Sequence, residues 1–285
     1  MKTENKKNVP FLLSLDVEDT YFYNKGKWEL KRNNRLPMLI DRYIEFCDRL
    51  NINTTVFILG ATAKNHPEAI QSLINSGHEI GCHTVNHNSL QEFTRESFKE
   101  DLLKNCEVLN QLGAVEIRGF RSPFFSCAPQ NQWIWEVLKD LGFVYSSSVL
   151  PARSPMYGWK NFGLFPCEVH PGFFEIPVSV SSTPFYQVPF ASGACLRFLP
   201  DWSIKHFQKR YDQTDCPLVN YIHPHDFDHD TCAKSKDYGR LFKISHHYNR
   251  KSVFLKLTRL INEFRVRRYV DYCNERMHAS DECGL

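Results

Sequence analysis

Two histidines stand four residues apart in the stretch HEIGCHTVNH, and their spacing is the first sign of chemistry in this chain. They are His83 and His87, and an imidazole can bind a metal ion or transfer a proton near neutral pH. A single helical turn after a strand would bring both rings to one side. Two imidazoles and a carboxylate around one dication make a common catalytic zinc site. The pair alone is a weak signal, because hydrogen-bonded histidines are frequent in proteins.

Three acidic residues follow an apolar run in the stretch SLDVED. They are Asp16, Glu18 and Asp19, and neighbouring carboxylates repel one another unless a cation or a basic group compensates them. An isolated acidic turn of this kind is usually a solvated loop. Beside two histidines at the end of a neighbouring strand, it favours a metal site.

Basic side chains end two further strand-like segments. Arg121 follows EIRGF, and His223 and His225 come directly after LVNYI. In β/α barrels the working residues lie just beyond the carboxyl ends of the strands. Four segments that end in carboxylates, imidazoles or a guanidinium therefore predict one site at one rim of a barrel.

The elements that must position these residues alternate along the chain. Short apolar runs predict strands, and apolar residues spaced three and four apart predict helices. The strands are expected at 9–16, 53–60, 78–83, 116–123, 143–149, 173–179 and 218–223, and the helices at 37–50, 66–77, 94–111, 132–142 and 202–211. Strand and helix repeated six or seven times indicate a parallel sheet covered by helices. A closed or nearly closed β/α barrel fits this pattern better than a doubly wound sheet, and one domain over 1–285 is the simpler organisation.

Composition narrows the class of protein. The chain has 285 residues and a formal net charge of +3, which is too small to indicate a nucleic-acid partner. The amino end lacks the long apolar region of a secretory signal, and no apolar stretch has the length that spans a bilayer. The ten cysteines are dispersed, without a C-x-x-C pair. We therefore expect reduced thiols and a cytoplasmic location.

The motifs SLDVED, GHEIGCHTVNH, GFRSPFF and YIHPHD, in that order, resemble those of the polysaccharide deacetylase family (NodB homology, carbohydrate esterase family 4). The resemblance covers about residues 10–230, and its most specific part is H-x-x-x-H preceded by GHEIG. The opening and closing motifs resemble a subgroup associated with bacterial exopolysaccharide and O-antigen biosynthesis. The resemblance implies a distorted (β/α) barrel of six or seven parallel strands.

The resemblance also implies a metal site. His83, His87 and one carboxylate would hold a divalent ion, most often zinc, with cobalt, nickel, manganese or iron as alternatives. Asp16 falls where the family has its general base. Val17 replaces the second aspartate of the usual motif, so Glu18 or Asp19 must supply the ligand. We favour Glu18, because alternation along a continuing strand would put it on the same face as Asp16.

Further roles follow from the same resemblance. Arg121 matches the arginine that positions the base, and its alternative is a surface ion pair. Pro123 and Phe124 fall in the segment that binds the oxyanion and the substrate, with the backbone N–H of Phe124 as the oxyanion donor. His223 aligns with the catalytic acid that protonates the leaving amine.

The catalytic acid and the residue that orients it each have alternatives in this sequence. His225 is a rival for the role of His223, since it would face the same side of a continuing strand. The motif that supplies the family's orienting aspartate is missing, and Glu175 or Asp226 could replace it.

A basic helical extension is expected over about residues 235–285, after the deacetylase-like barrel. Residues 240–268 hold nine Lys and Arg against one acid, Glu263. An apolar stripe at helical spacing runs through Val253, Leu257, Leu260 and Phe264. Such a helix most often packs on the domain with a solvated basic face. The alternative is peripheral contact with an anionic membrane surface.

The predicted function is a metal-dependent hydrolase that removes N-acetyl groups from amino sugars of a bacterial surface polysaccharide or its cytoplasmic precursor. Its partner would be a carbohydrate carrying N-acetylhexosamine, met in the cytoplasm or at the inner face of the membrane, without nucleic acid. Two alternatives remain open: a catalytically weak relative that binds glycan or metal, and an amidohydrolase that acts on a small cyclic amide. The sequence does not indicate an oligomeric state.

Overall fold

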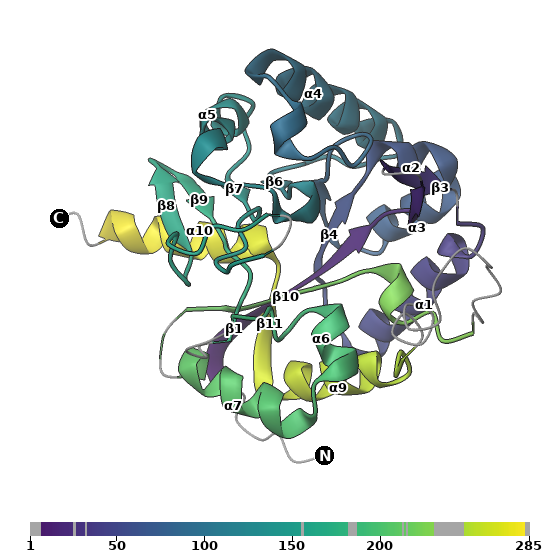
Figure 1. Ribbon diagram of the computed structural model, residues 1–285, viewed down its shortest axis with the longest axis vertical. Helices are drawn as coiled ribbons and strands as arrows, with labels where there is room; N and C mark the ends of the chain where they lie inside the picture. The colour runs from purple at the N-terminus through teal and green to yellow at the C-terminus, as the bar shows by residue number, and fades with distance from the viewer. Residues whose placement is uncertain are drawn as a thin grey trace.

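The computed structural model describes residues 7–24, 27–31, 33–154, 157–181, 187–212, 214, 216–230 and 248–282. Its centre is one curled sheet of mostly parallel strands (Figure 1). The strands of this sheet are β1 (Lys7–Val17), β4 (Thr55–Ile58), β5 (Glu79–Cys82), β6 (Gly119–Phe120), β7 (Tyr145–Ser146), β8 (Cys167–His170), β9 (Phe173–Glu175), β10 (Leu218–Ile222) and β11 (Phe264–Arg267). A separate antiparallel hairpin joins β2 (Thr20–Asn24) and β3 (Lys27–Lys31).

The strand order is β10-β1-β4-β5-β6-β7-β9-β8, with β11 added beside β1. Every pair along this path is parallel except β8 with β9. The predicted α/β fold of the distorted barrel type is therefore confirmed. In the described residues the sheet does not close on itself, since β10 and β8 form the two ends of the pairing order.

Helices lie outside the sheet and at its ends (Figure 1). They are α1 (Leu36–Leu50), α2 (Gly60–Asn65), α3 (Pro67–Asn75), α4 (Arg95–Gln111), α5 (Trp133–Asp140), α6 (Gly193–Phe198), α7 (Asp201–Asp212), α9 (Ser252–Glu263) and α10 (Tyr269–Glu282). Proline in the first turn starts α1 and α3, and Thr94 caps α4 by accepting a hydrogen bond from the N–H of Ser97. Short 3₁₀ turns at Leu90–Glu92, Pro123–Phe125, Pro129–Asn131 and Pro224–Asp226 complete the connections.

Strand β1 shows how the sequence separates core from site. Phe11, Leu13 and Leu15 alternate onto the face that packs under the helices. Ser14 and Asp16 occupy the opposite face, where both are buried and hydrogen-bonded to an arginine. A buried carboxylate is tolerated only when it is paired, so Asp16 needs the arginine at this position of the sheet.

In its described part, the C-terminal extension contains the helices α9 and α10, and a strand separates them. Val253, Leu257 and Leu260 form the buried stripe of α9, as predicted. The prediction that Phe264 ends the same helical stripe is wrong, because α9 stops at Glu263 and Phe264 begins β11. Residues 231–247, the first part of the expected extension, lie outside the described residues.

Strand β11 belongs to the main sheet. Phe11 of β1 pairs with Leu218 of β10 and also with Val266 of β11, so these two strands lie on opposite edges of β1. Strand β4 pairs with β1 further along, from Ser14 onward. The C-terminal segment therefore fills the edge of β1 that precedes β4.

Helix α9 carries two of the basic residues noted above, Lys256 and Arg259, and the Lys256 side chain is only 11% exposed. Arg259 pairs with Asp201 of α7, and the Nζ of Lys256 lies 3.7 Å from a carboxylate oxygen of the same residue. In the part of the chain with assigned positions, no helix combines the length and the apolar character needed to cross a membrane. The eight cysteines in this part are free thiols, and Cys232 and Cys283 fall outside it.

Candidate active site

The parallel strands deliver their terminal residues to one rim of the sheet. Asp16 is the penultimate residue of β1, and Glu18 follows that strand directly. His83, Arg121 and His223 come immediately after β5, β6 and β10. Residues that are up to about two hundred positions apart in the sequence thus meet at one place.

Glu18, His83 and His87 form a compact group at this rim. Their ligand atoms all lie within 4.8 Å of one another, and Glu18 Oε2 is 2.8 Å from His87 Nε2. The Nδ1–H of His83 donates to the backbone carbonyl of Arg121 at 2.8 Å, which leaves the Nε2 lone pair of that ring for a metal ion. Glu18 Oε2 is buried and accepts no hydrogen bond of good geometry. A divalent cation that prefers nitrogen and oxygen ligands fits this donor set.

The loop that carries the two histidines is not the helical turn we expected. Residues 83–87 form an irregular turn in which Thr84 (φ 67°) and His87 (φ 60°) are left-handed. The rings still approach, with centroids 5.4 Å apart. The prediction that H-x-x-x-H acts through helical spacing is therefore wrong, although the two imidazoles do meet.

Helix α4 holds this loop in place. Asp101 Oδ2 accepts a hydrogen bond from the N–H of Val85 at 3.0 Å. Asn105 Nδ2 donates to the carbonyl of Thr84 and, at 3.1 Å, to that of Ile58. Both residues are buried, and sequence reasoning missed them. The available signal was two polar side chains four apart on the apolar face of a helix.

Asp19, the alternative ligand, points elsewhere. Its carboxylate accepts hydrogen bonds from His66 Nε2 at 2.8 Å, from Asn65 Nδ2 at 2.9 Å and from the N–H of Asn33 at 2.9 Å. These donors saturate it and fix the turn after β1. The strand ends at Val17, so Glu18 reaches the histidines from this turn and not from a continuing strand.

Arg121 is buried, which excludes the surface ion pair considered above. Its Nη1 donates to Asp16 Oδ1 at 2.6 Å and to Ser14 Oγ at 2.7 Å. Its Nε and Nη2 donate to the carbonyl and hydroxyl oxygens of Ser147, and Nη2 also donates to Tyr269 Oη. Burial disfavours the guanidinium charge, but Asp16 and Tyr269 raise the pKa of Arg121 above its usual value. All five N–H groups of this side chain have acceptors.

His223 lies between the acids of the site. Its Nε2 is 3.2 Å from Glu18 Oε1 and 4.0 Å from Asp16 Oδ2, and its Nδ1 is 3.4 Å from Asp226 Oδ2. Burial lowers the pKa of this imidazole, but the hydrogen bond with Asp226 and the charges of the acids outweigh burial and raise it to about 9. His223 is therefore suited to hold and release a proton near neutral pH.

The structure separates the two candidates for the orienting acid. Asp226 contacts His223 directly. Burial raises the pKa of Asp226, but the neighbouring imidazoles of His225 and His223 outweigh burial and hold this pKa well below the usual range. Glu175 instead accepts hydrogen bonds from the N–H groups of Ser148 and Val149 and from Trp135 Nε1. Asp226 is thus the acid in place to orient the histidine.

His225 does not lie on a continuing strand, because β10 ends at Ile222 and a 3₁₀ turn follows. Its ring stacks on that of His223 with centroids 4.9 Å apart. Its Nε2 is 3.9 Å from Asp226 Oδ1, and its side chain is 42% exposed. The nearer approach to Glu18 and Asp16 belongs to His223.

Pro123 and Phe124 lie in the turn after Arg121. Phe124 (φ 59°) and Phe125 (φ 52°) are both left-handed, a conformation that costs energy for bulky residues and is often found at functional sites. Within the described ranges, the N–H of Phe124 has no hydrogen-bond acceptor. The Phe124 ring meets His87 edge-on, with ring centroids 4.4 Å apart, so this residue lies beside the histidine pair.

The protonation states of Glu18 and His83 favour the binding of a metal ion. Burial raises the pKa of Glu18, but His87, with His223 and His83, outweighs this effect and lowers the pKa to about 2. Burial lowers the pKa of His83 to about 4, despite the nearby acids. A deprotonated carboxylate and a neutral imidazole are the forms that bind a metal ion.

Comparison with known proteins connects this geometry to a family. Residues 34–146 match the model of the polysaccharide deacetylase family, and residues 147–274 match a domain of unknown function, DUF3473. The chain carries a polysaccharide deacetylase domain. The resemblance to the NodB-homology family is therefore confirmed, whereas the exopolysaccharide and O-antigen subgroup stays a prediction.

Curated relatives share the deacetylase segment. A peptidoglycan-N-acetylglucosamine deacetylase of Bacillus cereus is 31% identical over 99 residues, which are 35% of this chain and 34% of that protein. A chitin deacetylase of Cryptococcus neoformans is 29% identical over 35% of this chain and 22% of its own length. This chain thus spans about a third or less of these relatives.

Solved structures of deacetylase-like proteins share the fold of this chain. A candidate polysaccharide deacetylase from Mycobacterium smegmatis has a TM-score of 0.57 at 19% identity, over 86% of this chain and 79% of that one. A carbohydrate esterase family 4 pseudoenzyme from Bacillus anthracis has a TM-score of 0.52 at 11% identity, over 94% and 66%. At these identities the likeness concerns the fold alone.

Proposed function

We propose that this protein is a metal-dependent N-deacetylase of carbohydrates. The observation that carries the proposal is the convergence of a three-residue ligand group and two acid–base pairs at one rim. The buried ligand group of Glu18 with the two histidines lies beside Asp16, which Arg121 holds, and beside His223, which Asp226 orients. Hydrolysis of an N-acetyl amide needs an activated water, a stabilised oxyanion and a proton for the departing amine.

Glu18, His83 and His87 would hold the ion, and zinc is the metal we propose. When bound, such an ion lowers the pKa of water and polarises the acetyl carbonyl. Asp16 takes the proton from the attacking water, and the contact with Arg121 holds its carboxylate in place for this step. The N–H of Phe124 donates to the oxyanion.

His223 gives its proton to the nitrogen of the leaving amine. The bond between this nitrogen and the acetyl carbon breaks, and the products are acetate and a free amino sugar. Asp226 keeps the imidazole oriented and stabilises its protonated form. Because Asp226 contacts His223 and can serve as its orienting acid, we favour an active enzyme over a weak binding relative.

We propose an N-acetylhexosamine in a bacterial surface polysaccharide, or in its cytoplasmic precursor, as the substrate. The named relatives act on peptidoglycan and chitin, which are N-acetylated glycans, and this supports the chemical class. The cytoplasmic location and contact with a membrane surface stay predictions.

The test is acetate release from N-acetylglucosamine oligomers by the zinc-loaded protein. We expect turnover that His83→Ala and His223→Ala reduce by more than about 100-fold. His206→Ala, at an exposed position of α7, is the matched control and should keep full activity. Saturable glycan binding without acetate would indicate the binding relative, and turnover of a cyclic amide alone would indicate the other amidohydrolase. Reconstitution with cobalt, nickel, manganese or iron would identify the preferred metal.

A further inference from the structure

One partner of Arg121 comes from the far end of the chain. The Nη2 of Arg121 donates to the hydroxyl oxygen of Tyr269 at 2.8 Å, across 148 residues of sequence. The same hydroxyl lies 3.4 Å from Ser14 Oγ, which is also bound by Arg121. Tyr269 is fully buried, so water cannot take over as the acceptor.

The geometry of a guanidinium makes this contact important for Asp16. The group is planar, and its five N–H directions are fixed relative to one another. Nη1 faces Asp16 and Ser14, and Ser147 accepts from Nε and Nη2. Tyr269 Oη accepts the remaining N–H, and this contact fixes the rotation of the plane. A tilt of the plane would move Nη1 away from Asp16.

Aromatic rings enclose the same guanidinium. Its central carbon lies 4.2 Å from the ring centre of Phe57 and 5.5 Å from that of Tyr269. The Tyr269 ring meets Phe57 edge-on at 5.7 Å and stacks with Tyr145 at 5.5 Å. The phenol is thus held by packing as well as by its hydrogen bond.

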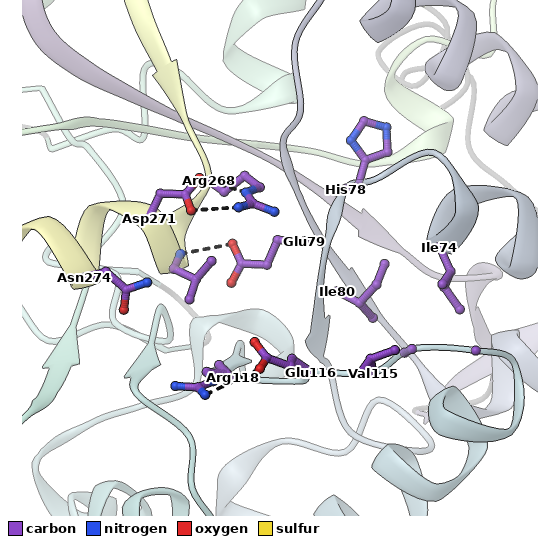
Figure 2. Close-up of a pocket in the computed structure, with 13 residues that line it drawn as sticks. Ile74, His78, Glu79, Ile80, Val115, Glu116, Arg118, Arg268, Asp271 and Asn274 are labelled. Atoms are coloured by element: carbon purple, nitrogen blue, oxygen red, sulfur yellow. Dashed lines mark hydrogen bonds and ion pairs between the residues drawn. The ribbon is translucent and has the colours of Figure 1, made fainter.

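The first turn of α10 is clamped by the starts of two strands. The N–H of Tyr269 donates to Thr55 Oγ1 at 3.0 Å. The N–H of Val270 donates to Glu79 Oε2 at 3.1 Å, and a dashed line marks this bond in Figure 2. Thr55 Oγ1 in turn donates to Glu79 Oε2 at 2.6 Å, and Tyr145 Oη donates to Glu79 Oε1 at 2.7 Å. A carboxylate at a helix N-terminus satisfies N–H groups that lack partners within the helix.

Glu79 occupies the opposite end of β5 from the metal group. It is the first residue of that strand, and His83 follows the last one. Glu79 is buried, and its burial raises its pKa against the effect of its hydrogen-bond donors. Within the described part of the chain, Glu79 accepts hydrogen bonds from Thr55, Tyr145 and Val270, and none of these is a residue of the catalytic rim. Its contact with α10 therefore indicates a structural role for this buried acid.

We propose that Tyr269 is a positioning residue for the Arg121–Asp16 pair, and that Glu79 holds Tyr269 in register. This inference rests on the proposed deacetylase function. It makes the C-terminal segment Phe264–Glu282 a part of the active site. The deacetylase family match ends at residue 146, so the matched segment alone lacks this support.

The test is Tyr269→Phe, which removes the hydroxyl and keeps the ring. We expect kcat to fall by about 10-fold to 100-fold while KM stays within about twofold, since no substrate contact is lost. The zinc content should equal that of the wild type. Tyr272→Phe is the matched control, because Tyr272 is a buried tyrosine of the same helix whose hydroxyl accepts from Arg276 Nε at 3.2 Å. This control should keep its kcat.

A double-mutant cycle separates positioning from a general loss of packing. If Tyr269 acts through Arg121, Tyr269→Phe should have no further effect on kcat in an Arg121→Lys background. Independent, multiplying effects of the two substitutions would overturn the inference. Glu79→Gln supplies a second variant, with a kcat reduced several-fold and an unchanged KM. A destabilised Glu79→Gln protein with full kcat would overturn the role of Glu79.

Failure of this inference can be told apart from failure of the proposed function. An active wild type with an equally active Tyr269→Phe protein contradicts the inference and leaves deacetylation intact. A zinc-loaded wild type that releases no acetate contradicts the deacetylase function, and the inference falls with it.

Discussion

Asp101 is a carboxylate whose ionisation opposes folding, and this property can be measured directly. It lies on α4, is 9% exposed, and accepts a hydrogen bond from the N–H of Val85 in the loop between the two histidines. Burial raises the pKa of Asp101 from 3.8 to about 6, although the Val85 N–H and Lys104 act in the opposite direction. We predict that Asp101→Asn stabilises the protein at neutral pH, because the amide oxygen can still accept from Val85 and carries no charge.

The sign follows from the raised pKa. The folded state binds a proton at Asp101 more tightly than the unfolded state does, so its contribution to stability is full below pH 3.8 and is lost as the pH rises through about 6. The difference between the two pKa values corresponds to about 3 kcal/mol at neutral pH. Between pH 4.5 and pH 7.5 the advantage of Asp101→Asn should grow by roughly 2 kcal/mol.

Urea unfolding of both zinc-loaded proteins across this pH range gives the measurement. Titrations of all other groups are common to the two proteins and cancel in the difference. Asp41→Asn, at an exposed position of α1, is the control and should show no growing difference. A difference that is constant with pH, or that shrinks as the pH rises, would refute the reasoning.

Three further results are expected. Asp226→Asn should lower kcat by about 10-fold to 100-fold and move the alkaline limb of the pH–kcat profile to lower pH, because Asp226 helps to raise the pKa of His223 to about 9; an unmoved limb would assign the orienting role elsewhere. Chelation of the metal should abolish acetate release and lower the free energy of unfolding by about 4 kcal/mol relative to protein with metal at a thousandfold excess over Kd, as urea titration would show, and equal stability would mean that the ligand group binds no ion. Glu175→Ala should cost about 2–4 kcal/mol of stability, because three buried N–H groups lose their acceptor, while kcat of the folded protein stays unchanged; a large loss of kcat would reopen the role of Glu175.

Much of the fold could be predicted from local patterns. Apolar runs mark the buried strands, and polar residues directly after them mark the carboxyl ends that meet at the rim. This is why Asp16, His83, Arg121 and His223 could be placed near one another before any coordinates. Because the strands are parallel, residues that follow the C-terminal ends of different strands lie at the same edge of the sheet.

The remaining features depend on contacts between distant segments. The turn after β5 is held by Asn105 of α4, and its left-handed residues leave no trace in the spacing of the histidines. The start of strand β11 resembles the end of an amphipathic helix in the sequence, because Phe264 continues the apolar stripe of α9. Tyr269 carries no local mark at all. Its role becomes visible only beside Arg121.

The two-sided pairing of β1 has a consequence for synthesis on the ribosome. Phe11 pairs with Leu218 and with Val266, so one margin of this first strand has no neighbour until about 250 further residues have been made. At roughly 5–20 residues per second, that delay is about 13–50 seconds. During this time a long hydrophobic strand exposes its backbone amides, which is the situation that promotes aggregation and recruits chaperones. Yield in a cell should therefore depend on how quickly synthesis reaches Phe264–Arg267, the strand that covers this margin.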